Sequence, residues 1–193
     1  MEHFYNSDIF EEGWFDYETL YTKMVNEFPT DSTFVEVGCW RGQSASYMCV
    51  EIANSDKSID FYCVDHWLPF SDSDNDPTKH LYETFLDNLQ PVKKYFNALR
   101  LESVKAACLF EDESIDFVFI DASHDYNSVK SDIMAWYPKV KKGGVIAGHD
   151  YVVDSLEFEV DKVVNELFPN DFELIQSTNP YVPHTYCFLK RKL

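Results

Sequence analysis

Residues 34–44 read Phe-Val-Glu-Val-Gly-Cys-Trp-Arg-Gly-Gln-Ser, and this stretch decides the fold. An apolar run opens it, and two glycines follow, Gly38 and Gly42, with small residues after them. A strand that turns through glycines into a helix brings backbone N–H groups close to a ligand at the helix N-terminus. The stretch therefore predicts a strand over 33–37, a helix over 43–54 and a ligand-binding turn between them.

The residue types in this turn indicate which ligand it binds. In a dinucleotide-binding turn, G-x-G-x-x-G, the middle glycine lets a pyrophosphate touch the backbone. Trp40 stands where that middle glycine would be, and the acidic Glu36 lies in the strand just before the turn. Both residues disfavour NAD and ATP and suit a nucleoside that carries a positive charge. We therefore predict that S-adenosylmethionine binds here, with Glu36, Gly38, Trp40 and Gly42 among its contacts.

Length and charge limit the number of domains and the classes of partner that the chain can have. The chain has 193 residues, of which 45% are hydrophobic, and we expect a single domain, 1–193, with residues 1–30 as an N-terminal helical extension. The net charge of −18 argues against a nucleic acid or an anionic membrane as the main partner, because both need a basic face. A small-molecule partner fits this charge, although an acidic surface that only confers solubility explains it equally well.

The cysteines and the N-terminal residues indicate the cellular compartment of the protein. The five cysteines are widely spaced and form no C-x-x-C pair, which is typical of reduced thiols. The first residues are acidic and lack an apolar signal core, and no apolar run approaches the ~20 residues of a membrane-spanning helix. We therefore expect a cytoplasmic protein. The sequence leaves a homo-oligomer open.

Strand-like and helix-like segments alternate along the chain, which predicts an α/β fold with a mostly parallel sheet and helices on both faces. Five strands belong to this alternating part, and two more, at 172–176 and 185–190, are expected to close the sheet as an antiparallel hairpin. The result is a Rossmann-like, doubly wound sheet of seven strands. Two local expectations are a basic turn over 139–144, before the fifth strand, and a helix over 156–168.

Acidic residues stand at four of the predicted strand ends, where ligands bind in an open parallel sheet. They are Glu36, Asp65, Asp121 and Asp150. Asp65 closes the second strand, and an ionised carboxylate there can accept hydrogen bonds from both ribose hydroxyls. A turn or helix cap is the alternative for Asp65. His66 follows directly and is placed to lie along the adenine.

Four motifs taken together resemble those of a known family. They are Val-Glu-Val-Gly-Cys-Trp-Arg-Gly-Gln-Ser (35–44), Tyr-Cys-Val-Asp-His-Trp (62–67), Asp-Phe-Val-Phe-Ile-Asp-Ala-Ser-His-Asp-Tyr (116–126) and Gly-Gly-Val-Ile-Ala-Gly-His-Asp-Tyr (143–151). In their order and spacing, the chain resembles the class I S-adenosylmethionine-dependent methyltransferases over about residues 30–165. The branch that it resembles holds the macrocin-type sugar O-methyltransferases and the cephalosporin-hydroxylase-like proteins.

This resemblance implies a fold and a set of cofactor contacts. The fold has a seven-stranded sheet whose last two strands form a hairpin. Asp65 would bind the ribose, Ser103 lies in the region that contacts the adenine, and Asp121 lies beside the cofactor. A serine at a helix N-cap accounts for Ser103 equally well.

The resemblance also implies a divalent metal ion, usually Mg²⁺, bound by Asp121, His149 and Asp150. These residues end the fourth and fifth predicted strands, which lie about 4.8 Å apart if they are neighbours. The ion would hold substrate hydroxyls and lower the pKa of the acceptor. His149 stands where the family has a carboxylate, and imidazole suits Mn²⁺, Fe²⁺ or Zn²⁺ better than Mg²⁺. The presence and identity of the metal are therefore open.

His124, three residues after Asp121, is the candidate general base, because its ordinary pKa lets it take a hydroxyl proton near neutral pH. Helix capping, or packing under the cofactor, is the alternative. The leading prediction is an O-methyltransferase that acts on a small hydroxylated acceptor, such as a sugar. The alternatives are a metal-dependent, hydroxylase-like member of the same fold and a module that binds the cofactor without catalysis.

Overall fold

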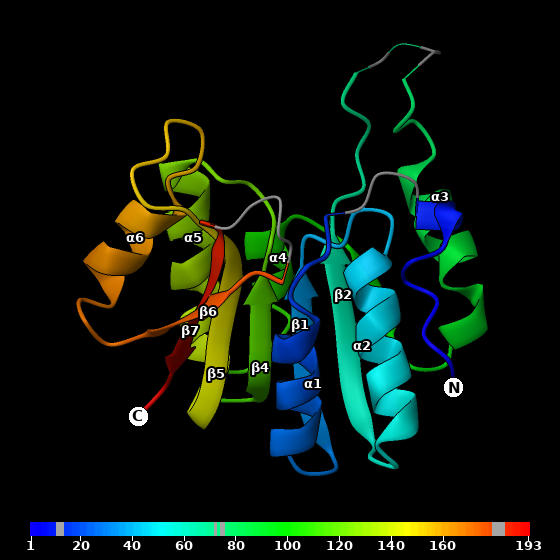
Figure 1. Cartoon of the computed structure of the whole chain (residues 1–193), viewed down its shortest axis with the longest axis horizontal. Coiled ribbons are helices and arrows are strands. Elements are labelled where there is room, and N and C mark those ends of the chain that lie inside the picture. Colours follow the sequence, from blue (N-terminus) through cyan, green and yellow to red (C-terminus); the bar gives the residue numbers. More distant parts are fainter. Residues whose placement is uncertain (11–13, 72, 74–75, 179–183) are drawn as a thin grey trace.

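The computed structural model describes residues 1–10, 14–71, 73, 76–178 and 184–193. Their strands form one seven-stranded sheet in the order β3-β2-β1-β4-β5-β7-β6 (Figure 1). The strands are β1 (Ser32–Val37), β2 (Ile59–Asp65), β3 (Asn97–Arg100), β4 (Ile115–Ile120), β5 (Val140–Tyr151), β6 (Glu173–Gln176) and β7 (Tyr186–Arg191). The α-helices are α1 (Glu18–Glu27), α2 (Gln43–Asn54), α3 (Leu81–Asn88), α4 (Ser103–Ala107), α5 (Tyr126–Trp136) and α6 (Val160–Leu167). Short 3₁₀ helices are η1 (Asp8–Phe10), η2 (Gln90–Val92) and η3 (Tyr137–Lys139).

The sheet topology confirms the predicted fold class. Strands β1 to β5 run parallel, and β7 lies antiparallel between β5 and β6, so the C-terminal hairpin is present as expected. Strand β4 pairs with β5, which the predicted shared site at their ends requires. The strand order reverses between β1 and β4, and ligands bind beyond the carboxyl ends of the strands at such a point.

Helices cover both faces of the sheet (Figure 1). Helices α1, α2 and α3 pack on one face and α4, α5 and α6 on the other, around two apolar clusters. Successive residues of a strand point to opposite faces. In β1, Phe34 therefore packs in the first cluster, and Val35 and Val37 pack in the second. Among the described helices, none is long and apolar enough to cross a membrane.

The expectation of a turn over 139–144 is wrong, because Lys139 ends η3 and residues 140–144 belong to β5. The ladder between β4 and β5 shifts register between Ile115 and Phe117, which marks a bulge on the β5 side. A bulge accommodates an extra residue and a left-handed backbone, and Gly143 has a φ of 80° there. The glycines and lysines that suggested a turn are thus carried inside an irregular strand.

The expected helix over 156–168 begins only at Val160. Before it, the Ser155 hydroxyl oxygen accepts hydrogen bonds from the backbone N–H groups of Glu157 at 3.1 Å and Phe158 at 2.9 Å. A serine that binds nearby backbone groups in this way offers the chain an alternative to the helix. The apolar spacing therefore predicted the helix but placed its start one turn too early.

The two glycines after β1 are required for packing. Gly38 has a φ of 86°, and a Cβ there would lie 1.9 Å from the backbone oxygen of Asp121. Gly42 has a φ of 90°, and a Cβ there would meet the side chains of Leu89 and Phe85 at 3.0 and 3.1 Å. The turn thus closes against the end of β4 on one side and against α3 and its following residues on the other.

Gly38→Ala is expected to lower the free energy of unfolding by about 3 kcal/mol or more, because the added methyl group collides with a backbone oxygen and the left-handed backbone strains an alanine. Gly143→Ala is the matched control. Its φ is 80°, but no described atom lies within 4 Å of the added Cβ, so only backbone strain of about 1 kcal/mol remains. Urea denaturation measures both losses, and equal losses would contradict a tight contact with Asp121.

Candidate active site

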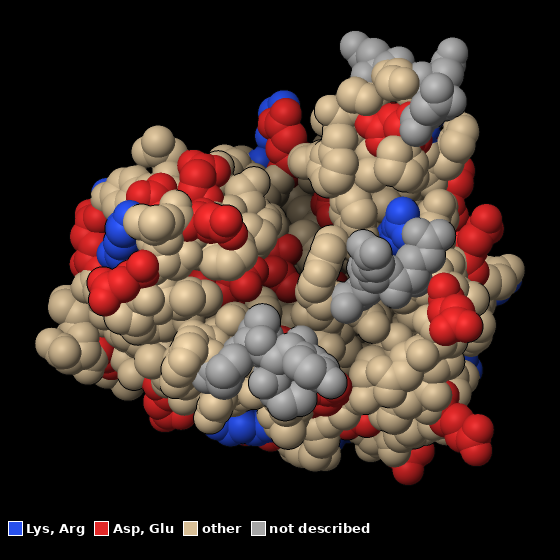
Figure 2. Space-filling model, turned by 45° about the horizontal axis from the view of Figure 1, so that its top comes forward, with Lys and Arg blue, Asp and Glu red and all other residues tan. Residues whose placement is uncertain are grey.

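A cavity of about 1010 Å³ opens beyond the carboxyl ends of β1, β2, β4 and β5. Figure 2 shows this hollow with acidic side chains inside it. Pockets of about 300–1,000 Å³ hold one drug-sized ligand, so the cavity has room for a nucleoside cofactor and a small acceptor together. The predicted site residues that line it are Gly38, Trp40, Asp65, His66, Ser103, Asp121, His124, His149 and Asp150.

Two predicted cofactor contacts, Glu36 and Gly42, are not among the described residues that line the cavity. The buried Glu36 side chain points to the α1–α2 face of the sheet, where it accepts hydrogen bonds from Tyr21 Oη at 2.7 Å and Ser44 Oγ at 2.8 Å. Burial raises the pKa of Glu36 to about 7, and these hydrogen bonds oppose the rise. In this position Glu36 links α1 and α2 to β1 through these hydrogen bonds, and it does not face the cavity.

Asp65 holds the turn in place. Its Oδ2 accepts hydrogen bonds from the backbone N–H groups of Cys39 and Trp40, each at 3.0 Å, and its Oδ1 accepts one from Trp67 at 2.8 Å. These bonds stabilise Trp40 at a φ of 46°, which residues other than glycine rarely adopt. His66 lies beside it, with Nδ1 3.8 Å from Asp65 Oδ1. The Asp65 carboxylate lines the cavity and already accepts hydrogen bonds from three backbone N–H groups. Its contact with a ribose stays a prediction.

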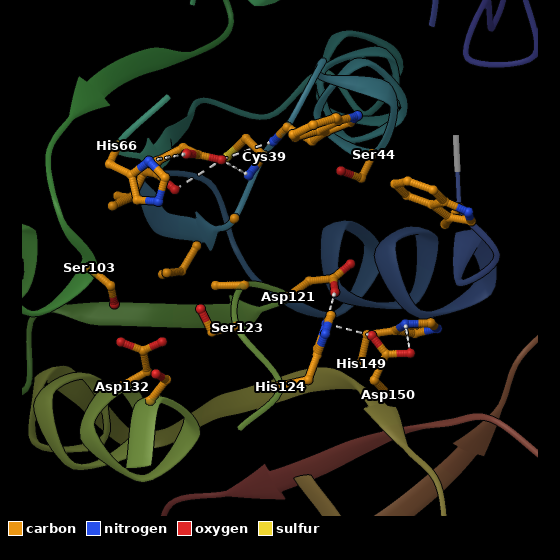
Figure 3. Close-up of a pocket in the computed structure, with 18 of the residues that line it drawn as sticks. Cys39, Ser44, His66, Ser103, Asp121, Ser123, His124, Asp132, His149 and Asp150 are labelled. Atoms are coloured by element: carbon orange, nitrogen blue, oxygen red, sulfur yellow. Dashed lines mark hydrogen bonds and ion pairs between the residues drawn. The ribbon is translucent and has the colours of Figure 1, made fainter. Parts of the chain in front are cut away.

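The far end of the cavity lies between α4 and α5. Ser103 begins α4, and its Oγ accepts a hydrogen bond from Trp136 Nε1 at 2.9 Å. Asp132 of α5 lies nearby (Figure 3), and burial raises the pKa of its carboxyl group while Ser103 opposes the rise. Asp132 was not among the site residues predicted from the sequence. One feature of the sequence could have indicated it: at helical spacing, Asp132 falls on the same face as the apolar residues Val129 and Trp136.

Three side chains converge at the other end of the cavity (Figure 3). His124 Nε2 lies 2.9 Å from Asp150 Oδ2 and 4.0 Å from Asp121 Oδ1. One donor atom from each of the three residues lies within 4.8 Å of the other two. His124 Nε2 is buried, and within the described chain it makes no hydrogen bond of normal geometry. A buried nitrogen that faces two carboxylates in this way marks a place where a cation can bind.

His149 lies beside this cluster and faces away from its centre. Its Nε2 lies 2.8 Å from Asp16 Oδ1, and its Nδ1 lies 3.3 Å from Asp150 Oδ1. Both His149 and Asp16 are buried. The predicted metal ligands thus lie close together, but the structure groups His124 with the two carboxylates and places His149 behind Asp150.

The segment before α1 contributes two residues that the sequence analysis missed. Tyr17 Oη donates a hydrogen bond to Asp121 Oδ2 at 3.0 Å, and Asp16 reaches His149. The Oδ2 of Asp16 also accepts a hydrogen bond from the Ser177 hydroxyl. These partners lie more than a hundred residues apart in the chain, so no local pattern could have indicated them.

The paired charges shift the pKa values in this part of the cavity. Interactions with Asp121 and Asp150 raise the pKa of His124 to about 9, and burial opposes them. Burial lowers the pKa of His149, but hydrogen bonds to Asp150 and Asp16 outweigh it and raise that pKa to about 10. Burial also acts to raise the pKa of Asp150, but the two imidazoles hold it well below its usual value. Both histidines are therefore protonated at neutral pH when no metal ion is bound.

Comparison with known proteins identifies the family. Residues 35–151 match the methyltransferase domain family. The chain belongs to this family. It is an S-adenosylmethionine-dependent methyltransferase, as its four motifs predicted. Among curated protein sequences, no relative matches this methyltransferase.

Solved structures share the fold of the methyltransferase at low sequence identity. An rRNA methylase from Streptococcus thermophilus is 12% identical, with a TM-score of 0.64 over 91% of this chain and 95% of that chain. An S-adenosylmethionine-dependent O-methyltransferase from Thermotoga maritima is 13% identical, with a TM-score of 0.64 over 91% of this chain and 64% of that chain. A methyltransferase-like protein from Streptococcus mutans, in complex with S-adenosylhomocysteine (SAH), is 11% identical, with a TM-score of 0.63 over 94% of this chain and 100% of that chain.

The stability of the metal-free methyltransferase is expected to fall as the pH rises from 7 towards 10. The pKa of His149 is about 10 in the folded protein and about 6.5 in an unfolded chain. The folded state therefore binds more protons in this window, and the stability present below pH 6.5 is lost as the pH rises through 10.

Urea denaturation in the presence of EDTA, at a series of pH values, measures this loss. Other groups also titrate in the window, so the comparison is with His149→Gln, whose stability should fall less steeply with pH than that of the wild type. Parallel pH profiles for the two proteins would contradict the raised pKa.

Proposed function

We propose that this methyltransferase transfers the methyl group of S-adenosylmethionine to a hydroxyl oxygen of a small acceptor. The observation that carries the proposal is a single cavity with the glycine turn and Asp65 in one part and the cluster of Asp121, His124 and Asp150 in another. The sulfonium of the cofactor is already activated. Catalysis therefore depends mainly on holding the acceptor in line with the methyl group and excluding water.

We propose that the cofactor lies along the turn, with its ribose at Asp65 and its adenine between α4 and α5. The buried carboxyl group of Asp132 adds an acceptor for the adenine amino group. Asp121, at the end of β4, lies between the cofactor and the acceptor. The remaining groups proposed to line this part are Gly38, the backbone of Trp40, His66 and Ser103.

A divalent metal ion fits the other part of the cavity. We propose Asp121, His124 and Asp150 as its ligands, in place of the predicted set that included His149. The buried nitrogen of His124 faces both carboxylates and supports this set, and two carboxylates with one imidazole suit Mn²⁺ or Fe²⁺. His149, held by Asp16, would orient Asp150 from behind. When bound, the ion would lower the pKa of the acceptor hydroxyl.

The group that receives the hydroxyl proton is proposed to be a carboxylate, in place of the predicted base His124. With a pKa of about 9, His124 already carries its proton at neutral pH, and a bound metal ion would occupy its nitrogen instead. Asp121 lines the cavity, with 24% of its side chain exposed, and can accept a hydrogen bond from the hydroxyl. The proton moves toward Asp121 as the acceptor oxygen attacks the methyl carbon, and the electron pair of the broken S–C bond stays on sulfur.

One alternative from the sequence, a hydroxylase-like enzyme of the same fold, is favoured by the same cluster of two carboxylates and one imidazole. It predicts Fe²⁺ binding and substrate-dependent consumption of O₂. The methyltransferase proposal predicts stoichiometric formation of SAH with no need for O₂. Turnover under anaerobic conditions therefore separates the two.

Calorimetric titration tests the proposed cofactor and metal sites. S-adenosylmethionine and SAH should both bind the metal-free protein, and Mn²⁺ should bind in a separate titration. Asp150→Asn should abolish Mn²⁺ binding and leave SAH binding in place, because it removes a charged ligand only from the metal cluster. Asp154→Asn, at an exposed acid after β5, is the matched control. Absence of SAH binding would overturn the cofactor site, and Mn²⁺ binding that survives Asp150→Asn would overturn the ligand set.

Asp65→Ala is expected to weaken SAH binding by about 1–3 kcal/mol, through loss of the ribose contact and of the bonds that order the turn. The same substitution should lower the free energy of unfolding, because three backbone donors lose their acceptor. Asp60→Ala, an exposed acid in the same strand, removes the same charge and serves as the control. Unchanged SAH affinity in Asp65→Ala would exclude Asp65 from the cofactor site.

A further inference from the structure

One wall of the cavity is built from apolar side chains that three separate segments contribute. They are Trp14 before α1, Trp40 in the turn after β1, and Leu68 and Phe70 after β2. The rings of Trp40 and Phe70 are stacked, with centroids 5.4 Å apart and planes 23° apart, and the ring of Trp14 lies 6.5 Å from that of Trp40. We call these four residues the aromatic wall.

The aromatic wall is unusually exposed for side chains of this kind. Trp14 is 70% exposed, Phe70 is 77% exposed and Leu68 is 54% exposed. Apolar side chains gathered at the mouth of a cavity mark a binding surface more often than those scattered singly. Aromatic faces of this size gain most from a flat, apolar partner that stacks on them.

The polar side chains next to the aromatic wall already have partners inside the protein. Gln43 accepts a hydrogen bond from the backbone N–H of Phe15 at 3.3 Å and donates one to the backbone oxygen of Tyr5 at 3.0 Å. Ser44 donates to Glu36, and Tyr17 donates to Asp121. A sugar needs a partner for each of several hydroxyl groups, and the hydroxyl protons of Ser44 and Tyr17 are already donated within the protein. A flat ring that presents one hydroxyl group to the acidic cluster has no such requirement.

The charge of the lining disfavours anionic acceptors, because six acids outnumber Arg41, His124 and His149. Arg41 is the one Lys or Arg among the described lining residues, against six acids. A carboxylate or phosphate on the acceptor would meet this negative field as it entered. Some solved structures of this fold are rRNA methylases, but the acidic hollow of this chain does not suit a polyanion (Figure 2). The six acids are Asp16, Asp65, Glu102, Asp121, Asp132 and Asp150.

We propose that the acceptor is a phenol without negative charge, which stacks on the aromatic wall and directs its hydroxyl group to the cluster of Asp121, His124 and Asp150. This inference rests on the proposed O-methylation and names the class of its acceptor. In the reaction the phenol loses its O–H proton to the carboxylate of Asp121 and then to solvent. The phenol oxygen forms the new O–CH₃ bond, and the cofactor leaves as the neutral thioether SAH.

The test uses a matched series of probes on the SAH-saturated full chain with Mn²⁺ present. Tyramine is cationic, 4-hydroxyphenylacetamide is neutral and 4-hydroxyphenylacetate is anionic, while all three carry the same phenol ring. Methyl glucoside and a short RNA oligonucleotide represent the other two acceptor classes. Calorimetry should show tyramine and the amide binding about tenfold or more tightly than the acid, with no binding of the glucoside or the RNA.

Variants of the aromatic wall separate this inference from the proposed function. Trp14→Ala and Phe70→Ala should each weaken tyramine binding about fivefold or more and leave SAH affinity unchanged. Leu109→Ala is the control, because Leu109 is 63% exposed and lies outside the described lining.

The outcomes of these titrations are distinct. Failure of SAH to bind the wild type would overturn the proposed function together with the inference. With SAH bound, a preference for the glucoside, the RNA or the anionic phenol would overturn the phenol assignment alone. Absence of tyramine and amide binding, or wall variants that bind tyramine as the wild type does, would overturn it as well.

Discussion

The close approach of Gly38 to the backbone carbonyl group of Asp121 is the constraint on which the rest of the site depends. The Gly38 N–H also donates to the Val64 carbonyl oxygen at 2.8 Å, and the Asp121 N–H donates to that of Val37 at 2.8 Å. The ends of β2, β1 and β4 are therefore fixed against one another by backbone contacts. Methyl transfer needs the sulfur of the cofactor and the acceptor atom held in line. The turn after β1, where we propose that the cofactor binds, and Asp121 are thus parts of one rigid unit.

The cluster of Asp121, His124 and Asp150 is completed by side chains from remote parts of the chain, and the charges of these side chains alternate in sign. From the N-terminal segment inward, the order is Asp16, His149, Asp150, His124 and Asp121. A buried carboxylate without a partner is costly, and in this row each acid lies next to an imidazole. Substitution of any one member therefore removes one charged partner from each of its neighbours. The row also explains why the segment before α1 belongs to the site, although its sequence carries no motif.

The sequence predicted what depends on local periodicity and on strand ends. Alternating segments gave the sheet, and Asp65, Asp121 and Asp150 lie in the cavity at the ends of parallel strands, as expected. Glu36 does not, because it shares the side-chain direction of Phe34 and points beneath the turn, a direction that the alternation within β1 could have indicated. The contact of Asp16 with His149 joins residues far apart in the chain. Such contacts depend on the whole fold, so no reading of local sequence reaches them.

The two carboxylates of the cluster of Asp121, His124 and Asp150 need a positive charge between them. Asp121 and Asp150 both lie within reach of His124, and in the metal-free protein the proton on that imidazole supplies the charge. A metal ion bound by the same three residues would have to displace this proton, because only neutral imidazole is a ligand. Proton and metal ion therefore compete for one place. With the pKa of His124 at about 9, this proton has to leave before a metal ion can bind, so metal binding by this cluster would tighten as the pH rises towards 9.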